Sequence, residues 1–275
     1  MTSIGLGASL NVLLNTHGPM ATLLYIFPHP DDESFGPGPA IARHRRDGHA
    51  VHLLTLTRGE ATSQRDRLGY SKEKMGTVRV AEMEDVANVL DLSSLTVLDL
   101  PDGQLADLDP RVLEQIVAAA IRQHAPDVVV TYPVHGISGH PDHLVTHAAV
   151  KRVVCQMRAD QDPHPARLAF FTLEPPADDP DRPDHLQHSA PSAIDCIVPV
   201  DERTLANGHA ALDCYQTYQS VVEAHQPLRS VASGIAFEIF GETHEPPLTD
   251  LVDTLDEAAL PPDTQEASPA TRPQA

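Results

Sequence analysis

Short apolar runs alternate with segments of helical character along most of the chain. The runs are five to seven residues long and predict buried strands at residues 21–27, 51–57, 95–100, 128–132, 168–173 and 194–198. The segments between and after them favour helices, at residues 39–47, 74–90, 111–124, 143–157 and 202–223. Strands and helices therefore follow one another in a regular order.

This alternation predicts the fold class. Strands that are separated by helices form βαβ units, in which consecutive strands run parallel. The predicted strands are apolar along nearly their whole length, so helices should cover both faces of the sheet. We therefore predict an α/β fold, a Rossmann-like three-layer sandwich with a mostly parallel central sheet. Because open sheets of this type bind ligands beyond the carboxyl ends of their strands, a site is expected just after residues 27, 57, 100 and 132.

The two ends of the chain depart from this pattern. Residues 1–19 precede the first strong strand and are expected to be a flexible extension. Residues 20–243 contain all the predicted elements and are expected to form a single domain. Residues 244–275 contain six prolines and seven acidic residues, which predicts a disordered acidic tail. Residues 174–193 are also rich in proline and are expected to form a surface loop.

Charge and hydrophobicity restrict the classes of function. The formal net charge is −20, so the protein should repel nucleic acid and anionic membranes. No apolar run reaches the roughly 18 residues of a membrane-spanning helix, so no membrane span is expected. No basic residue precedes the mildly apolar N-terminus, as a secretory signal would require. We therefore expect a cytoplasmic protein.

Two further features of the composition bear on its surroundings. The three cysteines are odd in number and lack CxxC spacing, so neither a disulfide framework nor a cysteine-built zinc site is expected. An acidic surface with three lysines and sixteen arginines is consistent with a halophilic source. A GC-rich genome is an alternative explanation for the shortage of lysine.

A group of titratable residues follows the first predicted strand directly. Residues 28–33 read PHPDDE, which places one imidazole and three carboxylates within five residues. Adjacent carboxylates repel one another unless a cation or strong donors compensate their charge. A tight turn could direct His29 and Asp32 towards one metal ion and leave Asp31 free to act as a base. An acidic, solvated turn is the alternative, but the position at a strand end favours a site.

A second group of histidines follows the fourth predicted strand. Residues 139–143 read GHPDH, and His135 and His147 lie nearby. The proline and the aspartate of this motif suit the first turn of a helix. A histidine beside a carboxylate can be a metal ligand or a tuned acid, so the residues alone leave open which histidine binds. In a chain with sixteen histidines, His135 and His147 are explained equally well by chance.

Together the two groups offer imidazoles and a carboxylate from two strand ends of one sheet. Two histidines and one aspartate, with a position left for water, are typical of a catalytic zinc site rather than a structural one. Zinc would lower the pKa of a bound water to roughly 7 and make hydroxide available at neutral pH. Iron(II) binds the same kinds of ligand and stays an alternative.

These residues resemble the LmbE-like, or PIG-L, family of zinc-dependent de-N-acetylases. The family's first motif, a strand followed by HPDDE, is matched at residues 28–33, and its second motif, HPDH, at residues 140–143. The resemblance runs over residues 21–158, in order and with comparable spacing. Weaker likenesses lie in between, to a TxGE turn at 57–60, an RxxE helix at 79–82 and a loop at 102–103.

The resemblance implies a role for each residue of the two motifs. His29, Asp32 and His143 would bind the zinc ion. Asp31 would be the general base that deprotonates the attacking water. His140 would stabilise the tetrahedral oxyanion and protonate the leaving amine.

The resemblance also implies contacts around this centre. Arg79 and Asp102 would contact the sugar hydroxyls or a neighbouring group of the substrate, and Asp142 would lie behind the metal ligands. Ser138 stands where some members that act on sugar thiols carry a tyrosine, so an auxiliary oxyanion donor is missing or comes from elsewhere. Residues 209–219 match the family's late helix only loosely, which leaves the substrate undefined.

The function that follows is hydrolysis of the N-acetyl group of an amino-sugar conjugate of the N-acetylglucosamine type. One alternative is a hydrolase of another N-acyl amide in secondary metabolism. A metal-binding protein without turnover is disfavoured, because it would not need Asp31 and His140. A nucleotide-binding protein is disfavoured because no glycine-rich loop follows the first strand. The expected partner is a small amino-sugar substrate, and a homo-oligomer is left open.

Overall fold

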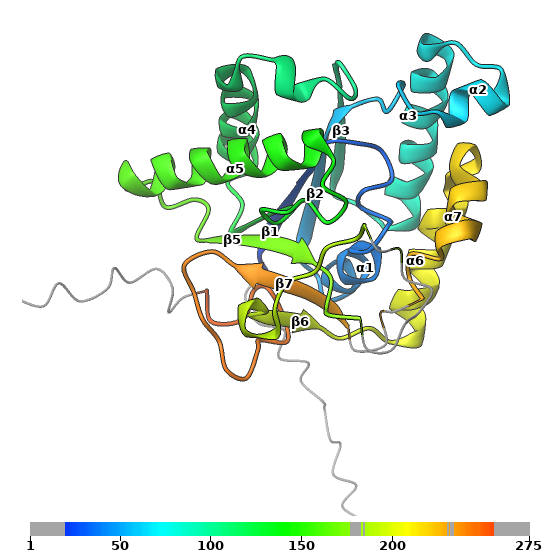
Figure 1. The fold of residues 1–275 in the computed structure, drawn as a ribbon. Helices are drawn as coiled ribbons and strands as arrows, with labels where there is room; N and C mark the ends of the chain where they lie inside the picture. Colours follow the sequence, from blue (N-terminus) through cyan, green and yellow to red (C-terminus); the bar gives the residue numbers. More distant parts are fainter. Residues whose placement is uncertain (1–19, 177–182, 184, 230, 232–233, 256–275) are drawn as a thin grey trace, which may run out of the picture.

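A computed structural model describes residues 20–176, 183, 185–229, 231 and 234–255 of the chain. In this part of the chain, one sheet has the strand order β3-β2-β1-β4-β5-β7-β6 (Figure 1). Strands β1 to β5 pair in parallel, and β7 lies antiparallel between β5 and β6. The strands are β1 (Thr22–Phe27), β2 (Ala50–Thr57), β3 (Ser94–Leu100), β4 (Val128–Thr131), β5 (Arg167–Thr172), β6 (Cys196–Val198) and β7 (Ile235–Ile239).

Helices cover both faces of the sheet. One face packs against α1 (Gly38–Arg46), α3 (Lys72–Val89) and α6 (Glu202–Cys214), and the other against α4 (Pro110–His124) and α5 (Pro141–Ala159) (Figure 1). The shorter elements are α2 (Gln64–Leu68), α7 (Gln219–His225) and the 3-10 turns η1 (Leu105–Asp107), η2 (Pro191–Ala193) and η3 (Gln216–Tyr218). The predicted three-layer α/β sandwich with a mostly parallel sheet is confirmed.

The central strand β1 explains why the strands are apolar throughout. Leu23 and Tyr25 lie in the core beneath α1, α3 and α6, whereas Leu24 and Ile26 lie in the core beneath α4 and α5. Because successive side chains of a strand point to opposite faces, a strand covered on both sides must be apolar at every position.

The long helix predicted at residues 202–223 is wrong in one respect, because it is interrupted. α6 ends at Cys214, and the turn η3 separates it from α7. In this turn the backbone N–H and the hydroxyl of Thr217 both donate to the carboxylate of Glu82 on α3, each at 2.7 Å. Tyr218 donates a hydrogen bond to Thr62, at 2.6 Å. These bonds to distant residues draw the chain out of the helix.

The packed part of the chain also extends beyond the expected limit at residue 243. Leu248 pairs with Cys196 of β6, and Leu251 is fully buried. Residues 244–255 therefore belong to the packed body, not to a disordered tail. The rest of that expected tail, residues 256–275, lies outside the described residues, as do residues 1–19 and most of 177–184. None of the helices in the described ranges combines the length and the apolarity needed to cross a lipid bilayer.

Arg167 holds this last segment in place. Its guanidinium is fully buried and donates to both carboxylate oxygens of Glu242, at 2.9 and 2.7 Å. It also donates to the carbonyl oxygens of Leu251 and Asp253, at 2.6 and 2.8 Å. One side chain therefore joins β5 to two turns of the chain that follow β7.

The Arg167→Met variant is expected to lower the free energy of unfolding by about 3–5 kcal/mol, because it leaves a partly buried carboxylate and two carbonyl groups without their cation. Chemical denaturation measures the change. Arg158→Met is the matched control, since Arg158 is exposed and makes single long bonds to carbonyl oxygens. The control should change stability by less than about 1 kcal/mol. If Arg167→Met also lowered the free energy of unfolding by less than about 1 kcal/mol, contacts other than those of Arg167 would hold residues 242–255 in place.

Candidate active site

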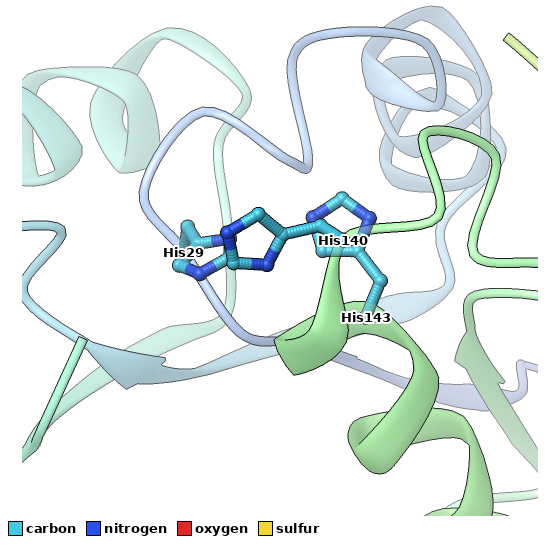
Figure 2. A group of neighbouring side chains, drawn as sticks. All are labelled: His29, His140 and His143. Atoms are coloured by element: carbon cyan, nitrogen blue, oxygen red, sulfur yellow. The ribbon is translucent and has the colours of Figure 1, made fainter. Parts of the chain in front are cut away.

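The candidate residues meet at the carboxyl ends of the central strands. A cavity of about 460 Å³ opens there, and all seven candidates from the sequence line it: His29, Asp31, Asp32, Arg79, Asp102, His140 and His143. Figure 2 shows the imidazoles of His29, from the turn after β1, and of His140 and His143, from the start of α5, facing one another. The cavity therefore lies beyond the carboxyl ends of β1 to β4, where the order of strands and helices predicts a site.

The turn after β1 separates two adjacent carboxylates. Asp31 has a left-handed backbone, with φ of 87°, and its N–H donates to the hydroxyl oxygen of Tyr215 at 2.8 Å. Its carboxylate is bound by Arg79 at 2.5 Å. Asp32 instead accepts hydrogen bonds from the His29 backbone N–H, at 2.8 Å, and from the Tyr132 hydroxyl, at 2.6 Å. The two carboxylates therefore have different partners and can have different roles.

The ring of His29 is oriented by carboxylates behind it. Its Nε2 lies 3.1 Å from Asp142 Oδ2 and 3.3 Å from Asp102 Oδ1, so this nitrogen carries the proton in the neutral ring. Asp142 is fully buried and also accepts the backbone N–H groups of Gly103 and Leu105. In the neutral ring the other nitrogen, Nδ1, therefore has no proton, and it lies 3.6 Å from Asp32 Oδ2.

His143 presents a free nitrogen to the same carboxylate. Its Nδ1 lies 2.9 Å from the carbonyl oxygen of Gly136, which makes Nδ1 the protonated nitrogen. Its Nε2 lies 3.4 Å from Asp32 Oδ1, and its ring stacks on Tyr132 with centroids 4.0 Å apart. Gly136 has φ of +63°, and a Cβ there would lie 2.9 Å from the Cβ of His143. Only glycine permits this approach without strain.

The donor set fits a divalent metal. His29 and His143 each direct one ring nitrogen towards the Asp32 carboxylate. The opposite nitrogen of each ring is held by a hydrogen bond, which leaves the nearer one able to bind a metal, as in a two-histidine, one-carboxylate site. Burial raises the pKa of Asp32, but the charges of His143 and His29 overcome this and lower it to about 2, so the carboxylate is ionised. Burial lowers the pKa of His29, but its hydrogen bond to Asp142 and the negative charge of Asp32 overcome this and raise it to about 10, so Nδ1 also holds a proton until a cation takes its place. A site that attracts a proton so strongly carries excess negative charge, which a cation would neutralise.

Asp31 is suited to exchange a proton near neutral pH. Burial raises the pKa of its carboxyl group to about 6, although the charge of Arg79 acts in the opposite direction. A base with a pKa close to the working pH can both accept a proton and release it again.

His140 caps the N-terminus of α5. Its Nδ1 accepts the backbone N–H of Asp142 at 3.2 Å, and its ring meets that of His29 edge-on, with centroids 4.8 Å apart. Because Nδ1 is an acceptor here, the ring is neutral and carries its proton on Nε2. Burial, with the nearby His29, also lowers the pKa of His140. The ring nitrogens of His29, His140 and His143 lie close enough together to bind one metal ion. The Nε2 of His140 carries a proton, however, so this nitrogen donates a hydrogen bond and does not bind a metal.

Arg79 and Asp102 line the cavity but already have protein partners. Arg79 is 1% exposed, and its guanidinium donates to the carbonyl oxygen of Pro30 at 2.6 Å and lies 4.1 Å from the centre of the Tyr218 ring. Asp102 accepts the backbone N–H of Ala61 at 2.6 Å through its other oxygen. Their expected contacts with a substrate stay predictions, and their visible contacts orient Asp31 and His29.

Three tyrosines of the site were not among the candidates. Tyr132 follows β4 directly, and Tyr215 and Tyr218 come from the junction of α6 and α7. Tyr215 also donates to the buried carboxylate of Glu33, at 2.7 Å. Tyr132 could have been found, because it stands at a predicted strand end. Tyr215 and Tyr218 carry no local signal, since their partners lie more than 130 positions earlier in the chain.

Comparisons with known proteins find de-N-acetylases among the proteins similar to this chain. The model of the GlcNAc-PI de-N-acetylase family, PIG-L, matches residues 24–154. A Kineococcus radiotolerans protein named 1D-myo-inositol 2-acetamido-2-deoxy-alpha-D-glucopyranoside deacetylase is 30% identical over 165 residues, which cover 50% of this chain and 46% of that protein. A Bacillus subtilis protein named "Probable N-acetyl-alpha-D-glucosaminyl L-malate deacetylase 2" is 32% identical over 150 residues, which cover 54% of this chain and 67% of that protein. The match thus spans less than half of the first relative.

Solved structures share the fold. The conserved protein TT1542 from Thermus thermophilus is 26% identical, with a TM-score of 0.58 over 80% of this chain and 94% of that one. GalB, a 4-carboxy-2-hydroxymuconate hydratase from Pseudomonas putida, is 18% identical, with a TM-score of 0.58 over 80% of this chain and 95% of that one. Because a hydratase has this fold too, the reaction has to be argued from the site. The two sequence motifs, the family match and the Bacillus subtilis relative together show that the chain belongs to the GlcNAc-PI de-N-acetylase family, PIG-L.

Proposed function

We propose that the protein is a metal-dependent hydrolase that removes the N-acetyl group from an amino-sugar conjugate. The observation that carries the proposal is the pair of imidazole nitrogens, one from His29 and one from His143, freed on either side of Asp32. The names of the two relatives support the substrate class, because both contain an N-acetylated glucosamine unit. Another N-acyl amide is the alternative substrate.

The metal would be held by His29 Nδ1, Asp32 and His143 Nε2. Zinc fits this set, and iron(II) fits it by ligand type. When bound, such a metal supplies Lewis acidity, which polarises an acyl carbonyl and lowers the pKa of water. Asp142 and Asp102 would keep His29 in the tautomer that binds.

Asp31 would act as the general base. Its carboxylate would take the proton of the attacking water, and Arg79 would hold it in position through the contact at 2.5 Å. Once protonated, Asp31 could pass this proton to the leaving nitrogen, so that the C–N bond breaks to give acetate and a free amine.

His140 would stabilise the oxyanion. Its Nε2–H is a donor that needs no proton from solvent, and a fixed donor aimed at the developing charge stabilises a tetrahedral intermediate. The second role expected for His140, protonation of the amine, has less support. A doubly protonated ring would set its Nδ1–H against the backbone N–H of Asp142. We therefore favour Asp31 as the proton donor.

Metal analysis combined with an acetate-release assay tests the proposal. The purified protein should contain about one zinc or iron per chain, and a chelator should abolish acetate release from N-acetylglucosamine conjugates. Added metal should restore the activity. A protein that binds no divalent metal, or that keeps full activity after chelation, would contradict the proposal. Hydrolysis of other N-acyl amides, without release of acetate from the N-acetylglucosamine conjugates, would favour the alternative substrate.

A further inference from the structure

The cavity has one polar and one apolar wall. Its polar wall contains Thr62 from the chain after β2, Asp102 from the chain after β3, and Arg79 from α3. The lining on the other side comes from the ends of β4 and β5 and the chain beyond. It is mainly apolar, with Ile137, Phe171, Leu173, Pro183 and Leu186, and includes Ser138 and the exposed His185. In the strand order β3-β2-β1-β4-β5, the two walls lie on opposite sides of β1, whose end carries His29 and Asp32. The proposed metal ligands therefore lie between a polar and an apolar surface.

The apolar wall is built in place by the fold. Phe171 is 4% exposed and packs so closely on Gly36 that a Cβ there would lie 2.0 Å from the ring. The N–H of Gln187 donates to the carbonyl oxygen of Ile137 at 2.7 Å. The N–H of Ser189 donates to the carbonyl oxygen of Leu173 at 3.1 Å. These two bonds hold the segment that carries Leu186 against the chain after β4 and β5.

The geometry of an amide connects the two walls. A secondary amide is planar and trans, so its acyl carbon chain and its nitrogen substituent extend in opposite directions from the carbonyl. The hydroxyls of a sugar need hydrogen-bond partners. The Thr62 hydroxyl accepts a hydrogen bond from Tyr218 and can itself donate one, and the Asp102 carboxylate can accept another beside that from Ala61. An amide that places its sugar there and its carbonyl beside Asp32 directs its acyl group towards Phe171, Leu173 and Leu186.

A methyl group needs little of this apolar surface. A wall formed by side chains from three separate segments offers contacts that an acetyl group cannot reach. The cavity, about 460 Å³, lies in the range of sites that enclose a whole small molecule. From this excess of apolar lining we infer that the site accepts an unbranched acyl chain longer than acetyl, with its methylene groups against Phe171, Leu173 and Leu186. The inference rests on the proposed amide hydrolysis and specifies its acyl group.

A series of N-acyl glucosamines tests the inference, from N-acetyl through N-butanoyl to N-hexanoyl, with kcat/KM as the readout. Each buried methylene should raise kcat/KM about three- to fourfold. Affinity provides a second readout, because the Asp31→Asn variant should bind these substrates without consuming them. Its Kd, measured by calorimetry, should fall by a similar factor for each methylene. Methyl and octyl glycosides of N-acetylglucosamine form a parallel series in which only the aglycone changes.

Two tryptophan variants locate the effect. Leu186→Trp should fill the apolar wall, so that the ratio of kcat/KM for the N-hexanoyl substrate to kcat/KM for the N-acetyl substrate falls at least tenfold. Val134→Trp is the matched control, because Val134 is 68% exposed and does not line the cavity. It should leave the whole series unchanged.

Several results would overturn the inference. A kcat/KM that falls from N-acetyl onwards, or a Leu186→Trp variant that affects all chain lengths equally, would do so. A gain that follows the aglycone and not the acyl chain would also do so. In each of these cases cleavage of the N-acetyl substrate leaves the proposed function intact. If no N-acyl substrate is cleaved by the metal-loaded protein, and the Kd is the same for all chain lengths, both the proposed function and the inference are wrong.

Discussion

The Asp31→Asn variant is expected to lose about 10²–10⁴-fold in kcat for amide hydrolysis and to keep its metal. The amide of asparagine cannot accept the proton of water, so general-base catalysis is lost. The metal should stay, because the side chain of Asp31 contacts Arg79, whereas the freed nitrogens of His29 and His143 face Asp32.

Asparagine is the right replacement at this position for a conformational reason. The φ of 87° at Asp31 lies in the left-handed region, which aspartate and asparagine enter more readily than other residues with a side chain. An alanine variant would add backbone strain to the chemical change. Asp31→Asn therefore isolates the loss of the base.

The pH dependence of activity gives a second measurement. Burial raises the pKa of Asp31 to about 6, with Arg79 opposing, and the base works only when it is ionised. In the wild-type protein kcat/KM should therefore fall as the pH drops through about 6, and Asp31→Asn should lack this limb. Metal content should be unchanged in the same samples.

Asp99→Asn is the matched control for this experiment. Asp99 also pairs with an arginine, Arg58, at 2.7 Å, but the pair lies outside the cavity lining. The control should keep its activity within about twofold. A kcat for Asp31→Asn above a tenth of the wild-type value would show that another group takes the proton.

Those parts of the site that follow strands could be predicted from the sequence. A buried parallel strand is recognisable as a short apolar run, and ligands gather where such strands end. His29, Asp31 and Asp32 follow one run, and His140 and His143 follow another, so local patterns were enough to place all of them at one edge of the sheet.

The other parts could not be predicted because their partners are remote in sequence. Nothing near Tyr215 indicates that its hydroxyl meets Asp31 and Glu33 on the other side of the site. The apolar side chains at 171 and 173 belong to a predicted buried strand and the one at 186 to a predicted surface loop, so only the fold shows that all three line one cavity. Leu251 was assigned to a disordered tail because residues 244–275 are rich in proline and acidic residues. In the structure Leu251 is fully buried, and its carbonyl oxygen accepts a hydrogen bond from the distant Arg167.

The His143→Ala variant is expected to weaken metal binding more than a hundredfold and to abolish hydrolysis. Loss of a residue that only orients a metal ligand costs about 10–100-fold in affinity, and loss of the ligand itself should cost more. His143 Nε2 is one of the two nitrogens that face Asp32. Its removal leaves His29 and Asp32 with too few protein ligands for a catalytic site.

His147→Ala separates this effect from general damage to the helix. His147 lies one turn later on α5, is also buried, and bonds the carbonyl oxygen of Tyr132 at 2.9 Å, but it does not line the cavity. Its variant should lose some stability and keep its metal, measured by metal analysis and by titration of the metal-free protein. If both variants lost metal to the same extent, the histidines of α5 would support the site through packing alone. If only His143→Ala loses metal, His143 Nε2 binds the metal ion, because Nδ1 of the same ring is held by the carbonyl oxygen of Gly136.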